Sequence, residues 1–156
     1  MRRAVAAAPR RHSGFTLVEV MVALVVLAVG MLGIAGLYLE GLRASRTSIY
    51  VTAATTLAGD MAERIRANGP GGPAYAGTGP GADNNCVNGP ADCAPDQLAA
   101  DDWFRWLRDV QARLPAGATA EIAVTPGAAT TRYAITLRWP ELGRPDPTSY
   151  TLAVDL

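Results

Sequence analysis

Residues 20–39 form a run of 20 residues without a charged side chain, which limits what this part of the chain can form. As an α-helix the run would be about 30 Å long, because each residue adds about 1.5 Å along the axis. That length matches the hydrocarbon core of a bilayer, and elements of soluble cores rarely continue so far without polar residues. The run therefore predicts a transmembrane segment over about residues 18–39.

The stretch before the run is basic. Arg2, Arg3, Arg10 and Arg11 all precede Phe15, and no acidic residue does. Positive residues beside a span stay on the cytoplasmic side, so we expect the rest of the chain to lie across the membrane. That rest carries 10 arginines against 14 acidic residues, a net charge of about −4. An acidic body argues against a general nucleic-acid surface, which needs clustered positive charge.

The helical pattern continues beyond the apolar run and becomes amphipathic. Asp60 and Arg64 have the favourable i,i+4 order of an ion pair, and "NGPGGP" from Asn68 onward supplies a stop. We therefore predict one helix over residues 15–68, whose second half docks on the head. The positions with helical spacing are Leu42, Arg46, Ile49, Ala53, Leu57, Met61 and Ile65.

Residues 69–156 are predicted to form a globular head. Glycines and prolines fill residues 69–95, which we expect to be a surface loop without regular structure. A helix should follow over about residues 96–114, with Asp96 as N-cap and Asp101–Arg105 as an ion pair on its outer face. Its predicted core stripe is Trp103, Trp106, Leu107, Val110 and Leu114.

Three alternating segments within about residues 119–156 predict a small antiparallel sheet. These segments are "AEIAVTP", "RYAITLRW" and "SYTLAVDL", and Gly/Pro-rich turns separate them. One face of such a sheet meets water while helices cover the other. The expected fold class is thus α+β.

Cys86 and Cys93 are the two cysteines, and both lie in the loop of the head, with residues 86–93 forming the Cys loop. Outside the cytoplasm they would form a structural disulfide, whereas in a reducing compartment they would be free thiols. Their separation does not fit the C-x-x-C spacing of a redox pair.

"GFTLVEVMVALVVLAVGML", from Gly14 onward, resembles the prepilin signature of type IV pilins and type II secretion pseudopilins. Further stretches resemble the minor pilins of the PilV type, also called type IV pilus modification proteins. These stretches are "LAGDMAERIRAN", the loop with paired cysteines and "DDWFRWLRDVQARLP". The resemblance implies a pilin-like fold, in which a long N-terminal helix packs on a small sheet.

The resemblance also assigns roles to single residues. Prepilin peptidase would cut after Gly14, so that residues 1–14 are a leader, and would then methylate the nitrogen of Phe15. Glu19 would set the register of assembly by pairing with the N-terminal amine of a neighbouring subunit; alternatively, it only reaches the membrane interface. Two features depart from the pattern. The leader is longer than usual, and Gly36 stands where major pilins often have proline.

The sequence gives little support for a catalytic or metal-binding site. His12 is the only histidine and lies in the predicted leader, so we expect no catalytic residues, no metal site and no cofactor in the mature chain. Asp83, Asn84, Asn85 and Asp92 match no spaced calcium loop and fit ordinary turn chemistry better.

We therefore expect a minor pilin of the bacterial inner membrane that later enters the pilus, and not an enzyme. The expected partners are prepilin peptidase, other minor pilins, the major pilin, the inner-membrane assembly platform and the lipid bilayer. The expected function is to promote pilus assembly, adhesion and twitching motility through a tip or priming complex. The alternatives are a type II secretion pseudopilin, a signal-anchored periplasmic binding module, and a secreted protein cut near Gly36.

Overall fold

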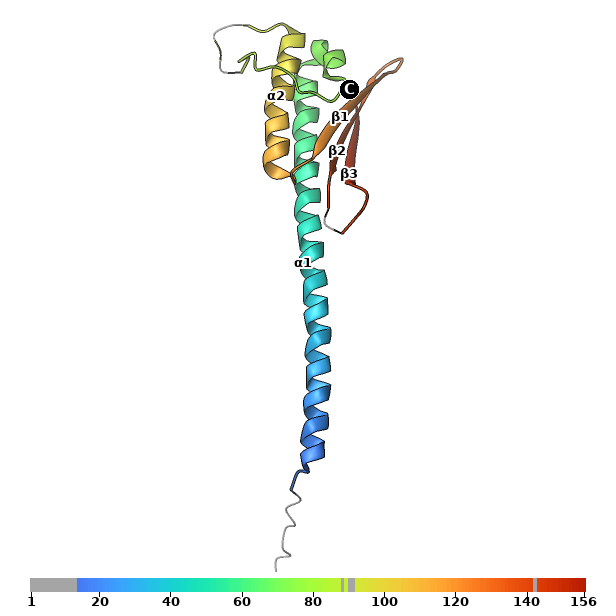
Figure 1. Ribbon diagram of the computed structural model, residues 1–156. Coiled ribbons are helices and arrows are strands. Elements are labelled where there is room, and N and C mark those ends of the chain that lie inside the picture. Colours follow the sequence, from blue (N-terminus) through green and yellow to red (C-terminus); the bar gives the residue numbers. More distant parts are fainter. Residues whose placement is uncertain (1–13, 88, 90–91, 142) are drawn as a thin grey trace, which may run out of the picture. The chain divides into compact units, whose positions relative to one another are not determined.

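The computed structural model describes residues 14–87, 89, 92–141 and 143–156. These residues belong to two compact units, Met1–Arg43 and Ala44–Leu156. Apart from Gly14, the predicted leader lies outside the described residues. The elements are α1 (Leu17–Ala67), the 3-10 helix η1 (Gly69–Tyr75), α2 (Pro95–Arg113), β1 (Thr119–Pro126), β2 (Thr131–Trp139) and β3 (Thr148–Asp155) (Figure 1).

The predicted α+β fold class is confirmed. Within the described parts of the chain there are a long N-terminal helix, two further helices and one three-stranded antiparallel sheet. The strands follow the order β1-β2-β3, so each strand pairs with its neighbour in sequence. Such pairing needs only short turns, and the Gly- and Pro-containing segments between the strands supply them.

The sheet is apolar on one face and polar on the other. In the middle of the register, Ile122 lies opposite Ile135, and Ile135 lies opposite Leu152. The outer face carries charged pairs across strands, such as Arg132 Nε to Asp155 Oδ1 at 2.8 Å. The alternation predicted from the sequence therefore sets which face enters the core.

The part of α1 that belongs to the unit Ala44–Leu156 buries a narrow face rich in alanine. Ile49 is 62% exposed and Leu42 is 49% exposed, and Arg46 is exposed as well, so the predicted docking face was wrong at these three positions. Contacts with other elements of the head begin earlier, since the Thr47 hydroxyl donates to Glu141 and Tyr50 packs half-buried against the core. Full burial of α1 side chains starts only at Ala54, where small side chains allow close approach. The buried residues of α1 are Ala54, Leu57, Ala58, Met61, Ala62 and Ile65.

The segment after α1 is more ordered than predicted. As expected, α1 ends at Ala67, just before Asn68. The expectation of no regular structure until Pro95 was wrong, because Gly69–Tyr75 forms η1. A 3-10 helix needs few residues and tolerates proline at its start, so this short element leaves no apolar period in the sequence.

The second helix carries the two tryptophans into the core, as predicted. Trp106 is 0% exposed and donates its Nε1 hydrogen to Leu57 O at 2.8 Å, which joins α2 to α1. Trp103 is also buried and donates to Tyr75 O at 2.9 Å. Each indole therefore fills apolar volume and satisfies its polar nitrogen.

Two details of α2 differ from the prediction. The N-cap is Ala94 and not Asp96, because proline is favoured at the first helical position and Pro95 occupies it. The side chain of Gln97 accepts a hydrogen bond from Ala94 N at 3.1 Å. Asp101 does pair with Arg105, but Asp101 is fully buried and does not lie on an outer face.

Candidate assembly site at the start of the long helix

Thr16 is the N-cap of α1. Its carbonyl oxygen accepts the first helical hydrogen bond, from Val20 N at 3.3 Å. Its hydroxyl oxygen Oγ1 accepts a second hydrogen bond from Glu19 N, also at 3.3 Å. The hydroxyl satisfies a first-turn backbone N–H group that has no i−4 carbonyl partner, so Thr16 determines where α1 begins.

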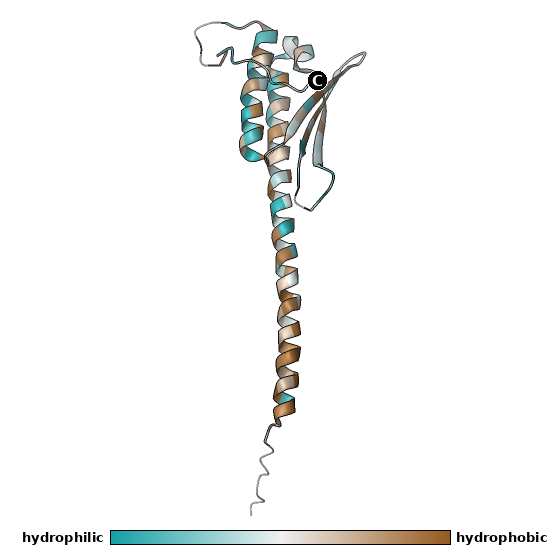
Figure 2. Ribbon diagram, in the orientation of Figure 1, coloured by the Kyte–Doolittle hydropathy of each residue, from teal (hydrophilic) through white to brown (hydrophobic). Residues whose placement is uncertain are grey.

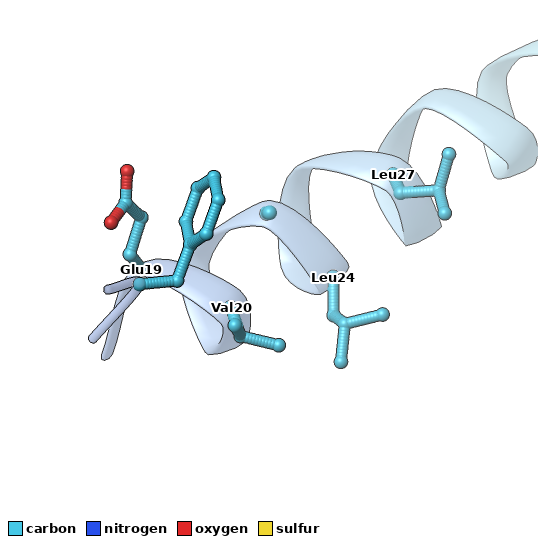
Figure 3. Close-up of a pocket in the computed structure, with 6 residues that line it drawn as sticks. Glu19, Val20, Leu24 and Leu27 are labelled. Atoms are coloured by element: carbon cyan, nitrogen blue, oxygen red, sulfur yellow. The ribbon is translucent and has the colours of Figure 1, made fainter. Parts of the chain in front are cut away.

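Glu19 lies in the first turn of α1, three residues after this cap. The helix dipole places partial positive charge there, which favours a carboxylate by about 0.3–1 kcal/mol. The side chain is exposed, and Figure 3 shows its carboxylate extending away from the helix. Thus the first turn tolerates the charge and leaves it free to meet a partner from outside the chain.

Phe15, Glu19 and Val20 line a shallow groove along this end of the helix together with Ala23, Leu24 and Leu27 (Figure 3). Apart from Glu19, every lining side chain is apolar. Phe15 is 82% exposed and contributes its ring to the wall of the groove. One carboxylate beside an apolar surface can accept a cationic group while neighbouring carbon atoms exclude water.

The side chains of the apolar run of α1 are exposed. Every large apolar side chain from Leu17 to Leu39 is exposed, and Figure 2 shows the hydrophobic colour over this part of the helix. Among the described residues, α1 is the helix whose length and composition suit a membrane crossing. Large exposed apolar surfaces mark contacts with lipid or protein, so this helix indicates membrane anchoring.

Gly30, Gly33 and Gly36 lie within the run at helical spacing. A Cβ atom added at any of the three would meet no heavy atom within 4 Å. Contacts within the described part of the chain therefore do not explain these glycines. Each lowers helix stability by up to about 1 kcal/mol relative to alanine.

The cysteines predicted to pair, Cys86 and Cys93, are joined by a disulfide in the head unit. Gly14 is described and exposed, whereas the rest of the predicted leader, including His12, lies outside the described residues. The structure brings Phe15 and Glu19 to one groove. The sequence interpretation missed Thr16, although T-x-x-E before an apolar run, here Thr16 to Glu19, is a known sign of a helix start.

Residues 9–35 match the family model of the prokaryotic N-terminal methylation motif. The match covers a small N-terminal part of the chain and contains the cap, the groove and most of the apolar run. The whole chain has no match among curated proteins or among solved structures. The motif coincides with the N-cap Thr16 and the exposed apolar part of α1 that follows it. Together these findings support a prepilin- or pseudopilin-type protein.

Proposed function

We propose that this protein is a minor pilin of the PilV type, which joins other minor pilins in a tip or priming complex and promotes pilus assembly. The observation that carries the proposal is the match of residues 9–35 to the methylation motif at the start of an exposed apolar helix. Proteins with this motif are structural subunits. The role that we propose is assembly, adhesion and twitching motility, and not catalysis.

The proposed processing follows the order of the residues. Prepilin peptidase cuts between Gly14 and Phe15 and methylates the new amine of Phe15. The leader, residues 1–14, keeps the cut site cytoplasmic through its arginines. Before assembly, the helix anchors the subunit in the inner membrane and the head, residues 69–156, lies in the periplasm.

In this proposal Glu19 finds its partner during assembly. The amine at Phe15 of a neighbouring subunit is cationic, and the groove beside Glu19 can receive it. The major pilin, other minor pilins and the inner-membrane assembly platform are the proposed partners. The chain would leave the bilayer for the filament because the filament supplies a counter-charge that lipid does not.

Mass spectrometry of the mature N-terminus tests the proposal directly. A chain beginning with N-methylated Phe15 supports a pilin or pseudopilin. A chain beginning near Leu37 would show that ordinary signal peptidase cuts a secreted protein. An intact Met1 would show a simple membrane anchor with a periplasmic binding module.

A minor pseudopilin of type II secretion is the second candidate, because the same methylation motif serves both filament systems. Deletion of the gene separates the two. Loss of surface pili and twitching with normal enzyme secretion supports the minor pilin. Loss of enzyme secretion with normal pili supports the pseudopilin.

The variant Gly14→Val is expected to abolish processing. A branched side chain before the cut bond prevents the close backbone approach that glycine allows. Intact mass should then show the full leader on nearly all of the protein. The control Ala7→Val makes a similar change inside the leader and should be cut normally. Normal cutting of the Gly14→Val chain would contradict the assigned site.

Replacing Gly30, Gly33 and Gly36 together by alanine is expected to reduce incorporation into filaments. The change stabilises the helix by up to about 3 kcal/mol in total, and so opposes local melting when the subunit leaves the bilayer. Quantitative immunoblots of sheared filaments measure the effect. The control Gly41→Ala, also in open space, should assemble normally.

A second variant separates local melting from close packing of helices. With Gly30→Ala and Gly33→Ala in place, Gly36→Pro should restore incorporation if melting is the role, because proline breaks the helix at that point. Close packing at small residues predicts no such rescue. Unchanged incorporation of the triple alanine variant would exclude both roles.

A further inference from the structure

The carboxylate of Asp101 is fully buried where α2 meets the segment before the disulfide. Its Oδ2 atom accepts a hydrogen bond from Arg105 Nε at 2.7 Å. Its Oδ1 atom accepts one from the backbone N–H of Asn84 at 2.9 Å. A buried charge is stable only when such donors surround it, and the Asn84 donor belongs to the segment before Cys86.

The loop segment that supplies the Asn84 donor lies along α2. Ala82 N donates to Ala100 O at 3.0 Å, and Asn84 Nδ2 donates to Gln97 O at 2.8 Å. At Gly81 the approach is so close that a Cβ atom would stand 2.3 Å from Ala100 O, and φ is +75°. Only glycine fits this position. The segment is exposed, so water competes for its hydrogen bonds whenever it moves away.

The disulfide attaches the same segment to the start of α2. Cys86 follows the donor segment directly, and Cys93 lies two residues before Pro95, where α2 begins. Both cysteines are half-buried, so small thiols can reach them. Reduction would remove the covalent attachment and leave the Asn84 donor held by hydrogen bonds alone.

We propose that Asp101 and the Cys86–Cys93 disulfide form one redox-dependent latch, in which oxidation holds the backbone N–H of Asn84 on the buried carboxylate. The bound carboxylate in turn favours the disulfide, because coupling between two equilibria is reciprocal. This latch does not depend on the proposed role in a filament. With this latch, the segment before Cys86 packs fully on α2 only after the protein has reached an oxidising compartment.

The covalent step is thiol–disulfide exchange with a small disulfide such as oxidised glutathione. The thiolate of one cysteine attacks the small disulfide and releases one glutathione thiolate. The second cysteine then attacks the mixed disulfide, closes the protein disulfide and releases the other glutathione. The two protein thiols are oxidised, and one oxidised glutathione becomes two reduced molecules.

Equilibration of the full-length chain in detergent micelles with glutathione redox buffers measures this coupling. Trapping of free thiols and intact mass then give the equilibrium constant for disulfide formation. Asp101→Asn should lower this constant by about tenfold, because asparagine lacks the charge and one acceptor. The matched control Asp102→Asn, whose side chain contacts Arg64 and Tyr75 instead of the loop, should change it by less than about twofold. An unchanged constant for Asp101→Asn, or an equal fall for Asp102→Asn, would overturn the latch.

Hydrogen exchange on the wild-type chain tests the same coupling without a variant that could fail to fold. The amide of Asn84 should lose protection by about tenfold on reduction with a phosphine. The amide of Gly77 donates to Ile122 O at 2.9 Å, away from the latch, and should keep its protection. Equal protection of Asn84 in both redox states would show that the loop needs no disulfide, and the latch would be wrong.

Discussion

A subunit with Glu19→Ala is expected to reach the membrane and to be cut normally, but its amount in sheared filaments should fall by about 30-fold or more. Removing one partner of a buried charge pair costs about 2–5 kcal/mol, largely because the other charge stays unpaired. Each 1.4 kcal/mol corresponds to about a tenfold change in equilibrium. Immunoblots of membrane and filament fractions from the same cells measure the ratio.

The loss of incorporation should result from the missing charge of Glu19 and not from the changed shape of its side chain. Processing should continue because the N-cap at Thr16 uses backbone and hydroxyl atoms that the substitution leaves in place. Glu19→Gln keeps the volume and removes the charge, and should therefore behave like Glu19→Ala. Incorporation of Glu19→Gln at the wild-type level would contradict the proposed pairing with an amine.

Glu40 supplies a matched control on the same helix. It is exposed, and its Oε2 atom lies 3.2 Å from Arg43 Nη1 in an i,i+3 ion pair. Exposed pairs of this kind contribute little, so Glu40→Ala should enter filaments at nearly the wild-type level. An equal loss for Glu40→Ala would show a general requirement for acidic residues on α1 and not a role of Glu19.

The elements that the sequence predicts well are those with a long, regular period. The apolar run and the amphipathic pattern after it extend far enough to predict α1, and the alternation in each strand predicts the sheet. The short helix η1 has only seven residues and no period, so neither pattern reveals it. Ala94 and Gln97 form the start of α2 because Pro95 takes the first helical position, a detail of local geometry.

Burial of single residues was less predictable, because it depends on what covers them. The spacing of Asp101 and Arg105 predicts an ion pair on either face of a helix. Only the loop that returns over α2 makes Asp101 a buried acceptor. In the same way, the period of α1 cannot show that Ile49 stays exposed, since that depends on the extent of the head.

Replacing Asp102 by alanine is expected to lower the free energy of unfolding of the head by about 3 kcal/mol. The Asp102 side chain is 8% exposed, and its Oδ1 atom accepts from Arg64 Nη1 at 3.1 Å. Its Oδ2 atom accepts from the hydroxyl of Tyr75. Loss of this carboxylate leaves a half-buried guanidinium and a buried hydroxyl without their shared acceptor, and so loosens α1, η1 and α2 together.

Urea unfolding in detergent measures this loss through the fluorescence of the tryptophans, all of which lie buried in the head. Asp60→Ala removes the other, more exposed partner of the same Arg64, at 2.9 Å, and should cost less than about 1 kcal/mol. A similar cost for both variants would show that Asp102 acts as an ordinary surface charge.

Because of the Tyr75 hydroxyl, the free energy of unfolding of the head should depend on pH in the alkaline range. Burial, and then the hydrogen bond to Asp102, raise the pKa of Tyr75 above its ordinary value. A raised pKa means that the folded head holds the Tyr75 proton more tightly than the unfolded chain does. The free energy of unfolding therefore keeps its full value below the unfolded pKa of about 10 and falls as pH rises above it. The loss should approach about 1.4 kcal/mol per pH unit in the wild type. Tyr75→Phe cannot ionise and should lack this component, whereas an unchanged alkaline slope in Tyr75→Phe would place the titrating group elsewhere.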